Sequence, residues 1–339
     1  MIRSWLRAHR SALATVTSGT VICAVIATVA VISNGYRAQR LDLGDGAVWV
    51  VNEARQAIGR ANTQVFELNT AVRSASAQID VLQSGETVLL VDHARSALDI
   101  IDPSTSAVTD SVPLPPGTGT VALGGGRVVI ETGGDVWFVP LADLTTFDAE
   151  SDPDLSLGAD AVTSVNTDGD LFVFSPETSS VYRVPATSET VTETTEVAEP
   201  AGGVQLSSVG SDFVLLDEAE SSVRFAGRTV PLPESAGARL QQPSLSGDRA
   251  LVGVDDGLVA VPQRGGDASF LTDSASGAAS RPASVGNCAF GAWSNGSVFT
   301  ECDGEPVSSE LEGFGGAADL VFRSNGDHVL LNDVAGGAA

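Results

Sequence analysis

A unit in which a Gly- or Asp-containing turn leads into a short apolar strand recurs along most of this chain. The eight copies of the unit lie at 44–52, 84–92, 125–133, 168–176, 210–218, 247–255, 286–294 and 326–333. Short strands are expected before seven of them, at 79–82, 120–123, 161–165, 204–209, 242–245, 282–285 and 320–322. These strands begin about 38 to 43 residues apart, a period typical of the four-stranded blades of a propeller. The repeat therefore predicts an all-β fold, a β-propeller that extends over residues 44–333.

The spacing favours seven blades. Six are complete between residues 78 and 318, and the seventh is assembled from residues 44–77 together with 319–333. A last blade that takes strands from both ends closes the ring and leaves no long unpaired sheet edge. The units at 44–52 and 326–333 both resemble second strands, however, so one shared blade has one strand too many. A ring of eight blades, or a chain that continues past Ala339, would resolve the surplus, and residues 334–339 are predicted to be a flexible tail.

The segment SGETVLLVDHARSALDIIDPSTSAVTDSVPLPPG (84–117) combines a Val-rich strand, an Asp-Pro-x-Thr turn and a returning strand. In this it resembles a blade of the bacterial YVTN-type or NHL-like β-propellers. An Arg-flanked apolar run followed by GAVWVVNEARQAIGRANTQVFELN (46–69) resembles the membrane-anchored propeller heads of actinobacterial surface proteins that carry fibronectin type III or immunoglobulin-like domains. These resemblances imply an extracytoplasmic role in binding or scaffolding.

Residues 12–32 contain no charged side chain. As a helix they would be about 31 Å long, enough to cross a bilayer core of about 30 Å. We predict a transmembrane helix over 12–33, a cytoplasmic N-terminus over 1–11 and a linker over 34–43. In this orientation the propeller is extracytoplasmic and is held to the cell membrane by a single pass. The arginines that flank the run give a slight preference for it. These are Arg3, Arg7, Arg10, Arg37 and Arg40. The alternative is a cleaved signal peptide, whose apolar region is normally shorter.

The chain is strongly acidic, with a formal net charge of −25 at pH 7, and all 18 of its basic residues are Arg. Such a surface repels phosphate backbones, which argues against nucleic-acid binding, and it also excludes a basic patch for membrane lipids. We therefore expect the propeller to present an acidic face to a protein, glycan or cell-wall partner.

Cys288 and Cys302 are equally far from Asn295 in the segment CAFGAWSNGSVFTEC. An Asn-Gly turn centred there makes a hairpin in which Gly291 faces Phe299 and the two cysteines face each other, close enough to bridge. We predict a disulfide, which suits an extracytoplasmic protein. The alternative is a pair of buried free thiols.

Asn166, Asp168 and Asp170 provide the oxygen ligands and flank the turn-forming glycine that calcium-binding loops use, so they are a candidate metal site. The bidentate Glu that completes an EF-type loop is missing at the required spacing. Asp and Gly are also favoured in strand-connecting turns for backbone reasons alone, which is the alternative explanation.

No catalytic motif is recognisable. The three histidines, His9, His93 and His328, form no HExxH pair, and no GxSxG sequence occurs. We expect neither enzymatic activity nor a cofactor, and favour a non-catalytic binding or scaffolding propeller. The alternatives are a propeller enzyme such as a hydrolase or lyase, or a sensor for a small ligand or an ion, acting at the central funnel. Converging His, Asp and Arg side chains in the funnel would favour the enzyme, and small or apolar side chains the binding module.

Overall fold

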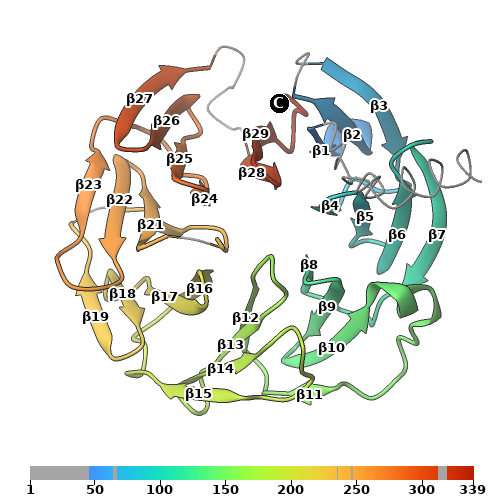
Figure 1. Ribbon diagram of the computed structural model, residues 1–339, viewed down its shortest axis with the longest axis horizontal. Coiled ribbons are helices and arrows are strands. Elements are labelled where there is room, and N and C mark those ends of the chain that lie inside the picture. The colour runs from blue at the N-terminus through green and yellow to red at the C-terminus, as the bar shows by residue number, and fades with distance from the viewer. Residues whose placement is uncertain (1–45, 64–66, 235, 246, 312–318) are drawn as a thin grey trace, which may run out of the picture. The chain divides into compact units, whose positions relative to one another are not determined.

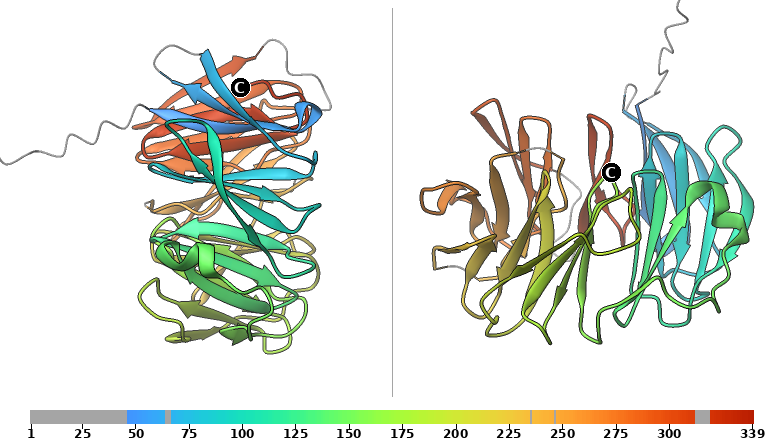
Figure 2. Two further views of the ribbon diagram at one scale, coloured as in Figure 1. Left: turned by 90° about the vertical axis from the view of Figure 1, so that its right-hand side faces the viewer. Right: turned by 60° about the horizontal axis from the view of Figure 1, so that its bottom comes forward.

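The computed structural model describes residues 46–63, 67–234, 236–245, 247–311 and 319–339. This part of the chain contains 29 β-strands and two short 3-10 helices, η1 (Glu53–Arg55) and η2 (Leu141–Thr146). The strands form sheets arranged radially around a central opening, so the fold is an all-β, seven-blade β-propeller (Figures 1 and 2). The predicted transmembrane helix at 12–33, with the segments 1–11 and 34–43, lies outside the described residues. Within the described ranges, no helix is both long and apolar enough to cross a membrane.

Six blades are four-stranded antiparallel sheets in which each strand pairs with the next one along the chain. Blade 1 consists of β4 (Ile79–Ser84), β5 (Thr87–Asp92), β6 (Ala97–Asp102) and β7 (Ala107–Pro113), and blade 2 of β8 (Thr120–Gly124), β9 (Arg127–Thr132), β10 (Asp135–Pro140) and β11 (Leu155–Ser156). Blade 3 consists of β12 (Val162–Val165), β13 (Leu171–Ser175), β14 (Ser180–Val184) and β15 (Glu193–Glu196), and blade 4 of β16 (Val204–Val209), β17 (Asp212–Asp217), β18 (Ser222–Phe225) and β19 (Arg228–Pro231). Blade 5 consists of β20 (Arg239–Leu240), β21 (Arg249–Val254), β22 (Gly257–Pro262) and β23 (Ser269–Thr272), and blade 6 of β24 (Ala283–Val285), β25 (Cys288–Ala292), β26 (Ser297–Cys302) and β27 (Glu305–Glu310). The first strand of each blade is the innermost (Figure 1).

Blade 7 closes the ring with strands from both ends of the described chain and is split into two sheets. One sheet contains β1 (Ala47–Asn52), β2 (Ala57–Asn62) and β3 (Glu67–Arg73), and the other is the hairpin of β28 (Leu320–Asn325) and β29 (His328–Asp333). The hairpin lies between blade 6 and β1 (Figure 1), because Leu320 and Phe322 pack against blade 6 whereas Val321 and Val334 join the core around β1. This split accommodates the surplus strand, and the described chain contains no further four-stranded sheet.

The inner edge of β1 pairs with no strand in the described structure, and side-chain amides bind its backbone instead. Gln83 of β4 accepts a hydrogen bond from the Trp49 N–H (3.0 Å) and donates one to the Ala47 carbonyl (3.0 Å). The fully buried Asn332 of β29 accepts a bond from the Val51 N–H (2.8 Å) and donates one to the Val51 carbonyl (3.0 Å). These amides therefore supply the hydrogen bonds that a further strand would make.

The second strand of a complete blade is buried along most of its length, because neighbouring blades cover both of its faces. This is so for β5, β9 and β17, and it confirms that the predicted units at 84–92, 125–133 and 210–218 place equivalent strands in successive blades. Outer strands such as β7 and β27 are mostly exposed and contain more polar residues. The buried apolar side chains of the described chain form seven clusters, each at a contact between neighbouring sheets.

The strand expected at 242–245 is wrong, since the first strand of blade 5 is the two-residue β20. Pro243 has no N–H to contribute to a ladder. The Gln242 N–H donates to the Pro282 carbonyl (2.8 Å), so this segment connects blade 5 to blade 6 and does not extend β20.

The end of the chain also differs from the flexible tail expected at 334–339. Val334 is buried against β1, and its carbonyl accepts a hydrogen bond from the Glu53 N–H (2.9 Å). The Val334 N–H donates to the Asp319 carbonyl (2.9 Å). The propeller therefore extends at least to Val334.

Candidate functional site

The central funnel contains a cavity of about 600 Å³ that is lined by the inner segments of four sheets. Its walls come from β4 of blade 1, the segment around β20, the segment before β24, and β28. A smaller cavity of about 150 Å³ adjoins it and shares the residues Leu82, Gln242, Phe322 and Arg323. Because the walls belong to separate sheets, this cavity forms only when the ring is closed.

One wall of the funnel cavity holds an ion pair. Arg323 of β28 lies 2.7 Å from the Asp80 carboxylate of β4 and donates a second hydrogen bond to the Val81 carbonyl (3.2 Å). This pair joins the C-terminal hairpin to blade 1. The charge of Arg323 is therefore already compensated by the protein.

Two further arginines line the cavity without a carboxylate partner among the described residues. Arg281 is oriented by hydrogen bonds from Nε to the Leu240 carbonyl (3.1 Å) and from Nη2 to the Gln241 carbonyl (3.0 Å). Arg281 is exposed to the cavity but surrounded by protein, and this desolvation, with repulsion from Arg239, lowers the pKa of its guanidinium. Arg239 is the first residue of β20 and is also exposed in the cavity. The funnel thus contains two arginines that form no ion pair with the described residues, and Asp319 is the other unpaired charged side chain of the described lining.

Two polar residues complete this wall. Ser280 is buried, and its Oγ has no hydrogen-bond partner in the described part of the chain. A buried hydroxyl in this state costs free energy unless a ligand or a water molecule supplies the bond. Gln242 donates from Nε2 to the Phe322 carbonyl (2.9 Å), which fixes the distance between blade 5 and β28.

The funnel cavity is suited to holding an anion. Its described ionisable lining residues are Asp80, Arg239, Arg281, Asp319 and Arg323, and His and Cys are not among them. Asp and Arg converge as they would in an enzyme, and because a guanidinium stays protonated near neutral pH, Asp80 and Asp319 are the described lining groups that could transfer a proton. Among the described residues, no three His, Cys, Asp or Glu side chains come together as a group that could hold a metal ion.

The candidate calcium residues share one turn, between β12 and β13, where the protein itself uses two of them. The Asn166 side chain accepts a hydrogen bond from the Asp170 N–H (2.8 Å). The Asp170 carboxylate accepts bonds from Arg183 (2.6 Å) and from the Ala186 N–H (3.0 Å). Burial raises the pKa of Asp170, but these bonds outweigh burial and the pKa is lowered overall. Asp168 is exposed, so the arrangement lends the calcium hypothesis no support.

A contact with blade 2 accounts for the shape of this turn. A Cβ atom on Gly124 or Gly125 would collide with the carbonyl of Asn166 or Asp168. Gly125 has a φ of +56° and donates its N–H to the Thr167 carbonyl (3.0 Å). The turn therefore serves as a close backbone contact between blades 2 and 3.

The predicted disulfide between Cys288 and Cys302 is confirmed, with the two Cα atoms 4.1 Å apart. The cysteines are opposite each other in the pairing of β25 with β26, and so are Gly291 and Phe299. Gly296 of the turn has a φ of +91°, a conformation that glycine adopts without a steric penalty. The bond closes a hairpin of blade 6 and has a structural role.

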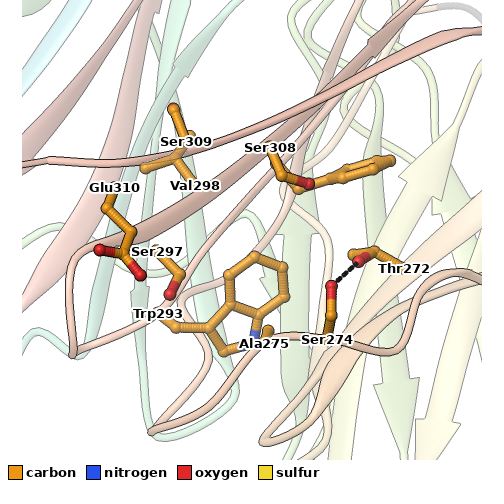
Figure 3. A pocket seen from close by; sticks show the side chains of 10 residues that line it. Thr272, Ser274, Ala275, Trp293, Ser297, Val298, Ser308, Ser309 and Glu310 are labelled. Carbon is orange, nitrogen blue, oxygen red and sulfur yellow. Dashed lines mark hydrogen bonds between the residues drawn. The ribbon is translucent and has the colours of Figure 1, made fainter.

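A second cavity, of about 450 Å³, lies between blades 5 and 6 (Figure 3). Hydroxyl groups are prominent in its walls, and those of Thr272 and Ser274 are hydrogen bonded to each other (3.1 Å). Glu310 is the one ionisable side chain among the described lining residues, and Ser297 lies opposite it in the pairing of β26 with β27. The Trp293 indole is almost fully buried. This cavity therefore offers hydroxyls and one carboxylate, but little aromatic surface, to a ligand.

The funnel arginines match no known motif, yet their spacing is a sequence signal. Arg239, Arg281 and Arg323 follow one another at intervals of 42 residues in a chain with only 18 basic residues. This interval is close to one blade, so it places an arginine near the inner strand of three successive sheets. The signal does not show which of them is neutralised, because Asp80 reaches Arg323 only through ring closure.

No family model and no curated protein matches this sequence. Among solved structures, BamB from Moraxella catarrhalis is 13% identical, with 84% of this chain and 89% of that chain covered and a TM-score of 0.54. Hsv2 from Kluyveromyces lactis is 11% identical, with 78% and 98% covered and a TM-score of 0.53. BBS1N, solved in complex with ARL6DN, is 14% identical, with 74% and 84% covered and a TM-score of 0.50. These likenesses confirm the propeller fold, and the resemblance to YVTN-type, NHL-like or actinobacterial surface proteins stays a prediction.

Proposed function

We propose that this protein is a non-catalytic β-propeller that binds or scaffolds an extracytoplasmic partner, with the central funnel as its recognition site. The observation that carries the proposal is the uncompensated charge of Arg239 and Arg281 in a cavity walled by four sheets. Guanidinium groups bind and orient oxygen-bearing groups, whereas they do not supply acid–base chemistry near neutral pH. A closed ring also holds such a site in a fixed shape.

A protein is the partner class that we favour. BBS1N has the same fold and was solved in complex with ARL6DN, so a propeller of this kind can present a surface to another protein. The acidic body of the present chain, with its net charge of −25, repels acidic partners everywhere except near a local group of arginines. A glycan or cell-wall partner would find its best match in the hydroxyls of the cavity between blades 5 and 6.

A sensor for a small ligand is the second candidate, and the volume of the funnel cavity favours it. About 600 Å³ falls within the range of small-molecule sites in proteins.

The membrane part of the proposal is that residues 12–33 hold the propeller at the outer face of a cell membrane. An uncharged run of this length is sufficient for one span. The Cys288–Cys302 bond supports an extracytoplasmic location, because disulfides persist in oxidising compartments.

Site-specific photo-crosslinking in cells tests the recognition site. A photo-crosslinking amino acid replaces the exposed cavity residue Asp319 in the full-length protein, and the matched control carries it at the exposed Thr194 on the outer strand β15. We expect discrete protein adducts from position 319 and none of the same mass from position 194. Identical patterns at both positions, or no adduct at position 319, would contradict a protein-binding funnel.

Fractionation tests the location. Intact protein should stay with membranes after a high-salt wash, and a reporter fused after Ala339 should be active outside the cytoplasm. A soluble form that begins near Val31 would show instead that the apolar run is a cleaved signal peptide.

A further inference from the structure

We propose that the funnel recognises an oxyanion, either a carboxylate or a phosphate group, held between Arg239 and Arg281 beside Ser280. The inference rests on the proposed binding role of the funnel and specifies the chemistry of the bound group. Its source is either a free small anion or an acidic group on a partner protein.

The first argument is that these two arginines share one cavity and have no carboxylate partner among the described residues. Arg95, Arg183, Arg224, Arg249 and Arg323 each have a carboxylate within 3 Å, whereas Arg127 and Arg228, outside the funnel, bind backbone carbonyls. The sequence contains 43 acidic residues for 18 arginines, so acidic partners are abundant. Arg239 and Arg281 have no carboxylate partner among the described residues. An anion from outside the described chain could therefore pair with them.

The second argument is orientation. The Leu240 and Gln241 carbonyls hold Nε and Nη2 of Arg281, and its Nη1 makes no hydrogen bond with the described residues. A guanidinium that is fixed in this way loses little conformational entropy when it binds a ligand. Arg239 lies close enough to repel it, and an anion between the two would convert that repulsion into two attractions.

The third argument is the hydroxyl next to the pair. Ser280 precedes Arg281, lines the same cavity and is about nine-tenths buried, and its Oγ lacks a partner among the described residues. This Oγ is closed off from solvent, and by turning toward the cavity it would add a hydroxyl donor to the two guanidiniums, a donor set suited to carboxylate or phosphate oxygens. The cavity of about 600 Å³ leaves space for the rest of the ligand.

Binding measurements on the purified full-length protein in detergent test this inference. The probes are inorganic phosphate, succinate and a short peptide with a free C-terminal carboxylate. The same peptide with a C-terminal amide is compared with it, and all probes are used at constant ionic strength. We expect at least one of the anions to raise the Tm, and Arg239→Gln to weaken its apparent affinity about tenfold or more, in line with the loss of one charge-assisted contact. Arg239→Lys should recover part of that affinity.

The matched control is Arg264→Gln, which removes an equally exposed arginine outside the funnel. Arg264→Gln should not change the Tm without ligand, because its side chain makes no hydrogen bond or ion pair within the described residues. Arg239→Gln should leave that Tm unchanged or raise it slightly, because it removes the repulsion from Arg281. A Tm that no anion alters, or an anion response that survives Arg239→Gln unchanged, would overturn the inference. Phosphate or succinate binding identifies a free anion as the source, and a preference for the free-carboxylate peptide identifies a protein terminus.

The crosslinking result separates this inference from the proposed function. Adducts at position 319 that form regardless of Arg239, together with a Tm that no anion alters, would leave the binding role intact and refute the oxyanion. Anion binding without any protein adduct would support the oxyanion and refute the scaffolding role.

Discussion

Asn332 is fully buried at the junction of the two ends of the ring, where its amide binds both backbone groups of Val51. A small polar residue ends several of the second strands of this sequence, and Asn52, Asp92 and Asp217 bind the turn that follows. Asp217, for example, accepts bonds from the N–H groups of Ala219 and Glu220. The residue of β29 that fits this pattern is its last one, Asp333, whereas Asn332 stands where β5 has Val91, so the pattern did not indicate it. The bond to Val51 could not be predicted, because it joins residues 281 positions apart.

We expect Asn332→Ala to destabilise the propeller by about 2–4 kcal/mol, since it leaves a buried N–H and a buried carbonyl of Val51 without partners. Urea unfolding followed by circular dichroism measures the change in the free energy of unfolding. Asn69→Ala on the exposed strand β3 is the control and should have little effect. Equal stabilities of the two variants would show that water replaces the amide at this edge.

The carboxyl group of Asp92 makes a pH-dependent contribution to the free energy of unfolding. Burial raises the pKa of its carboxyl, but hydrogen bonds from Arg95, Ser74 and Ser76 outweigh burial and lower the pKa to about 2. Since the pKa is depressed in the folded state, the contribution is fully present above the unfolded value near 4 and is lost as the pH falls toward 2. A shift of this size corresponds to about 2 kcal/mol.

We therefore expect Asp92→Asn to cost more stability at pH 6 than at pH 2, as measured by urea unfolding at both values. The exposed Asp212→Asn serves as the control. A difference between wild type and Asp92→Asn that does not change with pH would mean that the carboxylate charge is unimportant.

At the scale of elements, the hairpin of β25 and β26 shows how much a local signal can predict. Asn295 and Gly296 fix the turn, alternation fixes the faces, and the register of the two cysteines follows without knowledge of the rest of the fold. The strand expected at 242–245 lacked such a local determinant. Its N–H groups bond to neighbouring blades, and that choice depends on tertiary structure.

Reduction of the Cys288–Cys302 bond should lower the free energy of unfolding by about 3 kcal/mol, because the bond restricts the unfolded chain. Non-reducing peptide mapping should recover the two cysteines in one linked pair. Dithiothreitol should have no effect on the double variant Cys288→Ser/Cys302→Ser. Free thiols in exported protein, or a dithiothreitol effect that survives in the double variant, would contradict this prediction.

At the scale of the whole molecule, the repeat predicted the ring but not the contents of its funnel. Blade number follows from a period that each blade carries in its own sequence, whereas the funnel cavity combines residues from positions 80 to 323. No local pattern specifies which of its charges are paired. The split of blade 7 into two sheets could not be predicted from a local pattern either. Whether β29 pairs with β1 or the two strands belong to separate sheets is decided by how they pack.

The last residues of the chain provide a test of ring closure. Val334 is 7% exposed, packs in the cluster that contains Trp49 and Val51, and binds Glu53 and Asp319 through its backbone. Removing residues 334–339 exposes this part of the core and deletes those hydrogen bonds. The loss of a fully buried Val side chain alone costs about 1.5–3 kcal/mol.

We expect the truncated protein, which ends at Asp333, to unfold in a single transition at a lower urea concentration than the full chain. A single transition is expected because an open ring exposes a blade face on each side of the break, so weakening at the closure affects all blades. Val334→Ala isolates the side chain and should produce about 1–2 kcal/mol of the loss, from the apolar surface removed. If the truncated protein is as stable as the full chain, residues 334–339 are the flexible tail that the sequence first indicated, and closure depends on β28, β29 and the amides that bind β1.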